Sequence, residues 1–79
     1  MIKLTDFKTD KSTVSCKIYP EGSSASGALV IEKENGEILD YSLPQNYEWC
    51  INHVDHAARE LFRLSTDDTF PCEKIIYWY

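Results

Sequence analysis

Only one stretch of this chain repeats apolar residues at helical spacing, so a single helix must cover whatever sheet the rest forms. The stretch spans residues 46–64, between Pro44 and the polar segment that begins at Ser65. Asn46 is a residue type favoured at a helix N-cap, and we expect the helix to begin there. The other apolar runs are short and rich in β-formers. The sequence therefore predicts an α+β fold with one helix packed on one face of a small sheet.

The remaining runs predict the strands of that sheet. We expect strands in residues 1–7, in residues 13–19, in both arms of residues 28–43 and in residues 72–79. Apolar and polar residues alternate in the first two, which is typical of a half-buried strand. The predicted order is (β)βββαβ in an antiparallel or mixed sheet of four to five strands. A chain of 79 residues is expected to form a single small domain, residues 1–79.

Asn35 and Gly36 predict a hairpin within residues 28–43. A two-residue turn would place Leu29 and Ile31 opposite polar residues. A three-residue loop, in which Gly36 adopts a positive φ in a bulge, instead pairs Ile31 with Leu39 and Leu29 with Tyr41. Because the buried pattern specifies the register of a strand, we expect the bulged hairpin. Leu29, Ile31, Leu39, Tyr41 and Leu43 would then share the core face.

Charge and cysteine content exclude several classes of function. The formal net charge is −5, and the 8 basic residues are scattered along the chain, which argues against nucleic-acid binding and against an anionic membrane surface. The start of the chain is too polar for a signal peptide, and no run approaches the length of a membrane span. Three widely spaced cysteines do not form a disulfide framework. We therefore expect a reduced, cytosolic (cytoplasmic) protein.

Two histidines on the predicted helix are the main candidates for metal or catalytic chemistry. With about 100° per residue and Tyr47 as the origin, the buried stripe should hold Ile51, Val54, Ala58, Leu61 and Phe62. The opposite face should carry Trp49, His53, His56 and Arg63. His53 and His56 are neighbours on that face, but zinc needs four donors, or three plus water. The pair is a weak candidate for a metal or hydrolytic site, and no cofactor is expected.

A third hypothesis places a small-molecule site beside the loop of residues 20–27, next to Tyr47 or Trp49. The cysteines are weaker candidates for functional residues. Cys50 lies at the margin of the predicted stripe and Cys16 alternates with apolar residues, so we expect both in the core. Cys72 follows a proline in a loop. A buried cysteine is usually inert packing, and no partner for a nucleophile is visible.

The last strand suggests an interaction surface. Ile76 and Trp78 should point to one side of the sheet, and Ile75, Tyr77 and Tyr79 to the other. A strand that is apolar on both faces is usually buried on both, and one helix covers one face. The side with Ile76 and Trp78 therefore needs other cover, either from the N-terminal residues of the same chain or from a second molecule. We expect a non-enzymatic module that forms a homodimer or binds a protein partner. The predicted interface residues are Trp49, His53, His56, Arg63, Ile76 and Trp78.

Overall fold

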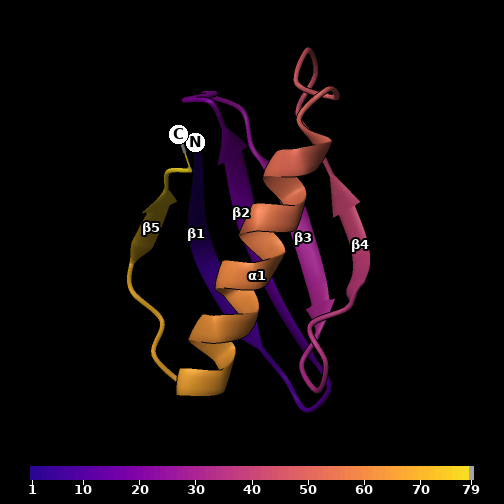
Figure 1. Ribbon diagram of the computed structural model, residues 1–79, viewed down its shortest axis with the longest axis vertical. Coiled ribbons are helices and arrows are strands. Elements are labelled where there is room, and N and C mark those ends of the chain that lie inside the picture. Colours follow the sequence, from indigo (N-terminus) through magenta and orange to yellow (C-terminus); the bar gives the residue numbers. More distant parts are fainter. Residues whose placement is uncertain (79) are drawn as a thin grey trace.

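The computed structural model describes residues 1–78 and contains a five-stranded sheet with one helix in front of it (Figure 1). In chain order, the elements are β1 (Ile2–Thr9), β2 (Thr13–Pro20), β3 (Gly27–Glu32), β4 (Ile38–Ser42), α1 (Ile51–Asp67) and β5 (Glu73–Ile76). The strand order across the sheet is β4-β3-β2-β1-β5, and every neighbouring pair is antiparallel. The predicted α+β class and element order are confirmed.

The core lies between α1 and the inner face of β1, β2 and β3. Each of these strands contributes alternate residues to that face, and all are buried: Ile2, Leu4, Val14, Cys16, Ile18, Leu29 and Ile31. The helix adds Val54, Ala57, Ala58, Leu61 and Leu64. A bulge at Asp6, which has a φ of 54°, interrupts the pairing of β1 with β2. After this bulge Phe7 packs against the core and lies 5.6 Å, between ring centroids, from Phe70.

The helix begins later than predicted. Asn46 is not its N-cap but has a φ of 73°, and two turns follow, in which the amides of Tyr47 and Cys50 donate to the carbonyls of Pro44 and Tyr47. These turns satisfy the backbone outside the helix, so α1 starts at Ile51 with Cys50 as its N-cap. At the other end, Asp68 takes a left-handed conformation that closes the helix.

The buried stripe of α1 is rotated from its predicted position. His53, predicted on the exposed face, is only 8% exposed, whereas Ile51, predicted in the stripe, is 55% exposed. The prediction took its origin from Tyr47, which lies outside the helix. Both residues lie at the margins of the true stripe, on opposite sides of it. Neighbouring segments of the chain cover the margin that contains His53 and leave the margin that contains Ile51 exposed.

The β3–β4 hairpin matches part of the predicted register. Leu29 pairs with Tyr41, and Gly36 has a φ of 77°, as expected. Ile31, however, pairs with Ile38 and not with Leu39, because the register shifts next to Val30. Ile38 therefore packs against the core. The predicted core positions of Leu39 and Tyr41 are wrong, since these side chains are 50% and 44% exposed.

The last strand separates Ile76 and Trp78 from Ile75 and Tyr77 as predicted, but the side with Ile76 and Trp78 faces the helix. Ile76 pairs with the buried Ile2, which places Ile76 on the helix side of the sheet. Ile76 and Trp78 both pack against the core of their own chain. Ile75 and Tyr77 are exposed, and Tyr79 lies outside the described residues. Ile76 and Trp78 are therefore covered by their own chain, which was the alternative to cover by a second molecule.

Gly27 offers a direct test of the close contact between β3 and β4. A Cβ at this position would overlap the carbonyl oxygen of Ser42 and lie 2.9 Å from its carbonyl carbon. We expect Gly27→Ala to lower the free energy of unfolding by about 2 kcal/mol, because the two backbones must separate to admit a methyl group. Chemical denaturation measures the change. Ser26→Ala, at the exposed neighbour, is the control, and equal stability of the two variants would contradict the packing.

Candidate functional site

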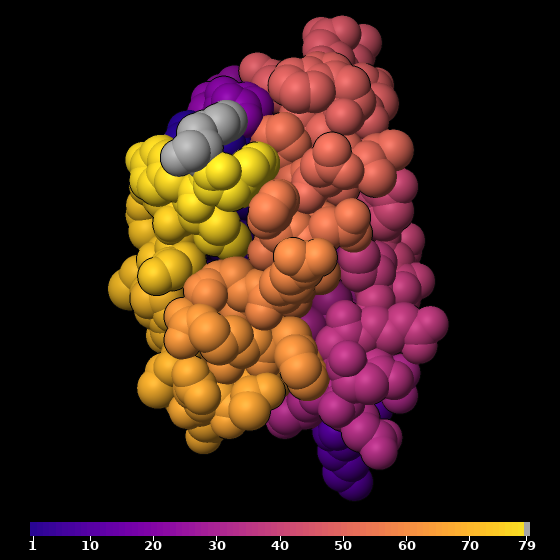
Figure 2. All heavy atoms as spheres, viewed as in Figure 1, coloured from indigo at the N-terminus to yellow at the C-terminus, as the bar shows by residue number. Residues whose placement is uncertain are grey.

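The structure brings five of the six predicted interface residues to one end of the molecule. The first turns of α1 meet the segment that follows β5, which lies beside the helix in Figure 2, and Trp49 joins this contact through His53. His53 is buried there, His56, Ile76 and Trp78 are half-buried, and Trp49 is 66% exposed. Most of this predicted surface is thus engaged in contacts within the chain.

Trp78 is held by both histidines. Its ring stacks on His56 with centroids 4.2 Å apart and planes 9° from parallel. It meets His53 edge to face, with centroids 4.7 Å apart. Trp49 approaches His53 in the same way at 5.6 Å, and its indole N–H donates to the carbonyl of Asn46 at 3.1 Å. These contacts fix residue 78 against α1 and account for the burial of His53.

Glu21 completes this cluster, and no pattern in the sequence indicated its role. Its carboxylate oxygen Oε1 lies 2.7 Å from Nε2 of His53 and 2.7 Å from the amine of Met1. A carboxylate accepts hydrogen bonds, so the hydrogen of this pair is on Nε2. The other ring nitrogen, Nδ1, is buried without a hydrogen-bond partner among residues 1–78. His53 is therefore oriented by Glu21 and enclosed by tryptophans.

Arg63 does not join the cluster. Its guanidinium binds the carboxylate of Glu60 through Nε at 2.7 Å and Nη2 at 2.8 Å, and that of Asp67 through Nη1 at 3.1 Å. These hydrogen bonds lower the pKa of Glu60 below its ordinary value. All three residues lie on α1 and form a network along its outer surface, which is the usual role of charges three and four residues apart.

The metal hypothesis gains no support from the positions of the histidines. Nε2 of His53 is engaged by Glu21, and one face of the His56 ring is covered by Trp78. Within the described part of the chain, no group of three or more His, Cys, Asp or Glu residues could hold a metal ion. A zinc site needs at least three protein ligands in most cases.

The cysteines behave as the sequence predicted. Cys16 and Cys50 are buried and Cys72 is exposed, and all three are free thiols. Burial raises the pKa of Cys16 to about 12. Burial and the nearby charge of Glu21 also raise the pKa of Cys50. Since the thiolate is the nucleophile, neither buried cysteine is activated for chemistry.

Two hollows of the surface lie away from the loop of residues 20–27, beside which the sequence predicted a small-molecule site. In that loop the hydroxyl of Ser23 donates to the carbonyl of Ala25 and accepts from its amide, which closes the turn. The larger hollow lies instead between the end of α1 and β5, and a smaller one of about 230 Å³ lies on the open face of the sheet beside Lys8, Ser15 and Lys17.

The exposed apolar surface on the β4 side of the helix was not predicted. Tyr41 pairs with the buried Leu29 and so shares its side of the sheet. Phe62 packs over Gly36 in the β3–β4 turn. Ile51 precedes Phe62 by about three helical turns and lies on the same stripe of α1. We call Leu39, Tyr41 and Ile51 the β4 rim. The predicted hairpin register placed Tyr41 on the helix side of the sheet. The side chain of Tyr41 is nevertheless exposed, because β4 is an edge strand.

Comparison of the chain with models of protein families, with curated proteins and with solved structures gives no match. In the described part of the chain, no helix combines the length and the apolar character needed to cross a membrane. Function must therefore be argued from the surface of this structure.

The two tryptophans should differ in their access to solvent. We expect acrylamide to quench the fluorescence of Trp78→Phe, which retains the exposed Trp49, more strongly than that of Trp49→Phe, which retains the half-buried Trp78. The slopes of Stern–Volmer plots give the comparison, with both denatured variants as references. Equal slopes in the native proteins would contradict the packing of Trp78 on the histidines.

Thiol reactivity should distinguish Cys72 from the buried pair. In the native protein we expect Ellman's reagent to modify Cys72 alone, since Cys16 and Cys50 are buried and their raised pKa values keep them protonated. Raising the pH from about 7 to about 9, across the ordinary pKa of cysteine, should not expose a second reactive thiol. All three should react after denaturation, and a second native thiol that appears near pH 9 would contradict this arrangement.

Proposed function

We propose that this protein is a non-enzymatic interaction module that associates with a second copy of itself along β4. The observation that supports the proposal is the β4 rim, in which Leu39, Tyr41 and Ile51 are each between 44% and 55% exposed. Neighbouring apolar side chains that remain exposed on a small protein commonly mark an interaction surface. The segments that carry the rim also reach the core, because Ile38, Leu43 and Phe62 pack against it.

The backbone of β4 adds to the apolar surface. β4 is an edge of the sheet, and no described strand pairs with its outer side. Proteins usually protect such an edge with lysine, proline or a covering segment. Ile38–Ser42 contains neither residue and carries one charge, that of Asp40. An edge strand of this kind is suited to pair with another strand.

The side chains of β4 favour an antiparallel partner of the same sequence. If a twofold axis passes beside Tyr41, the two Tyr41 rings face each other on the helix side. The same register places Asp40 opposite Ser42 of the second copy, so the two Asp40 charges do not meet. The hydroxyl of Ser42 accepts a hydrogen bond from the amide of Ala28 and still has its own hydrogen to donate. A closed twofold pairing of this kind uses one surface patch on both copies.

The opposite edge of the sheet is less suited to this role. β5 spans only Glu73–Ile76, and half of its residues are charged. Its inner side is partly covered, because Trp78 packs on α1 and Phe70 packs on Phe7. The two edges therefore differ in both charge and cover, and β4 is the one left open.

The oligomeric state in solution tests the proposal. By size-exclusion chromatography with light scattering, we expect the wild type to approach twice the 9.1 kDa mass of the chain as its concentration rises. Tyr41→Lys should remain folded, since Tyr41 is 44% exposed, but should stay a monomer because two lysines would face each other across the axis. Circular dichroism checks the fold of the variant.

Tyr77→Lys is the matched control, because Tyr77 is 67% exposed but lies beyond the opposite edge strand. This variant should dimerise like the wild type. A wild type that is monomeric at every concentration, or a dimer that tolerates Tyr41→Lys, would contradict self-association through β4.

A further inference from the structure

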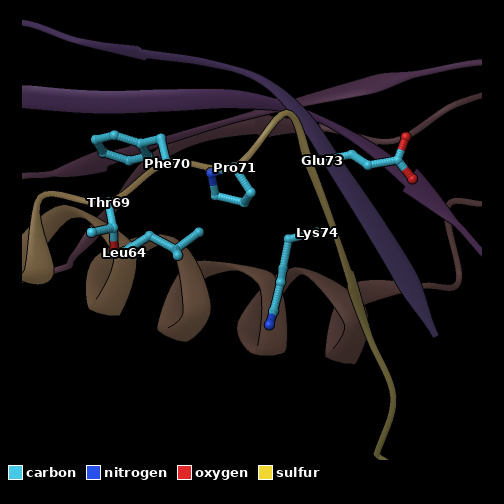
Figure 3. Close-up of a pocket in the computed structure, with 6 residues that line it drawn as sticks. All are labelled: Leu64, Thr69, Phe70, Pro71, Glu73 and Lys74. Atoms are coloured by element: carbon cyan, nitrogen blue, oxygen red, sulfur yellow. The ribbon is translucent and has the colours of Figure 1, made fainter.

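A second surface, at the opposite edge of the sheet, has the features of a ligand site. A hollow of about 670 Å³ opens between the C-terminal part of α1, the segment after it and the start of β5 (Figure 3). It is lined by Leu64, Thr69, Phe70, Pro71, Glu73 and Lys74. Its volume lies within the range of about 300–1,000 Å³ that is usual for small-molecule sites.

Most of the lining is apolar and is supported from below. Leu64 is 4% exposed and belongs to the buried stripe of α1. Phe70 is half-buried and rests on Phe7, which the bulge in β1 turns toward the core. Pro71 limits the backbone freedom of the wall beside Phe70. The apolar part of the hollow is therefore positioned by the core.

Lys74 is the unusual residue of the lining. It pairs with the fully buried Leu4, so its side chain lies on the helix side of the sheet, where its neighbours in β1 and β5 are Ile2, Leu4 and Ile76. Lys74 is itself half-buried. Within the described chain it makes no ion pair within 4 Å. Its charge helps to lower the pKa of Glu60, but among the described residues its ammonium group has no partner in direct contact.

The nearby carboxylates do not supply that partner. Glu60 is bound by Arg63 through two nitrogens. Glu73 pairs with Thr5 and alternates with Lys74, so it belongs to the open face of the sheet. Figure 3 shows the two side chains leaving β5 in different directions, with Lys74 directed toward the helix. Glu73 and Lys74 both line the hollow, but only Lys74 leaves the strand on the helix side.

We infer that this hollow binds a small amphipathic carboxylate, with its apolar body on Leu64, Phe70 and Pro71 and its carboxylate on the ammonium group of Lys74. The negative end of the α1 dipole lies at the Thr69 end of the hollow. The ligand therefore has one orientation, with its charge beside Lys74 and its chain toward Thr69. The site is separate from the β4 rim and does not depend on the state of association.

Two probes with the same chain and opposite charges test this inference: octanoate and octylammonium. In NMR titrations of the wild type, octanoate should bind about fivefold more tightly, as expected for one partly exposed charge pair. The amide shifts should concentrate in residues 69–74. Lys74→Met keeps the apolar stem and should remove the preference, and Lys74→Glu should reverse it.

Lys11→Met, in the exposed turn between β1 and β2, is the control and should retain the wild-type preference. Equal affinity of the wild type for the two probes, or binding of neither, would overturn the inference. So would shifts that lie outside residues 69–74, or a Lys74→Glu variant that still prefers octanoate.

Discussion

The structure depends on the contact between one helix and a sheet that is wider than the helix. Five strands at the usual spacing span about 19 Å, whereas a helix with its side chains is about 10 Å across. α1 therefore covers the centre of the sheet, where β1, β2 and β3 are buried, and leaves a margin on each side. The β4 and β5 margins of the sheet each need cover from something other than α1, and the two margins differ in the cover that they have.

On the β5 side, the chain after α1 supplies the cover. Trp78 stacks on His56 and meets His53, which Glu21 orients through Nε2, and Phe70 packs on Phe7. This explains why two helix residues that resemble a metal or catalytic pair serve to hold a tryptophan. On the β4 side, no segment among residues 1–78 covers the rim of Leu39, Tyr41 and Ile51 in this way. The proposed self-association therefore rests on this margin, and not on Ile76 and Trp78, which the sequence had suggested.

Local patterns in the sequence predicted the fold class, the element order and the pairing of Leu29 with Tyr41, because each depends on residues close together in the chain. The residues on each face of β5 were predicted correctly, but the face that lies under the helix was not, because it depends on the pairing of Ile76 with Ile2 at the far end of the chain. The burial of His53 was missed for the same reason, since its partners are Glu21 and Trp78. The predicted start of the helix was wrong for a local reason. Asparagine favours both the helix N-cap and the left-handed conformation, and Asn46 adopts the left-handed one.

The central claim is that β4, and not β5, is the edge left open to a second copy. Hydrogen–deuterium exchange measured at low and high protein concentration tests it by locating the surface that association protects. We predict that amides of Ile38–Ser42 gain protection as the concentration rises, while amides of Glu73–Ile76 do not change. Protection that is independent of concentration in both strands, or a gain confined to β5, would contradict the account.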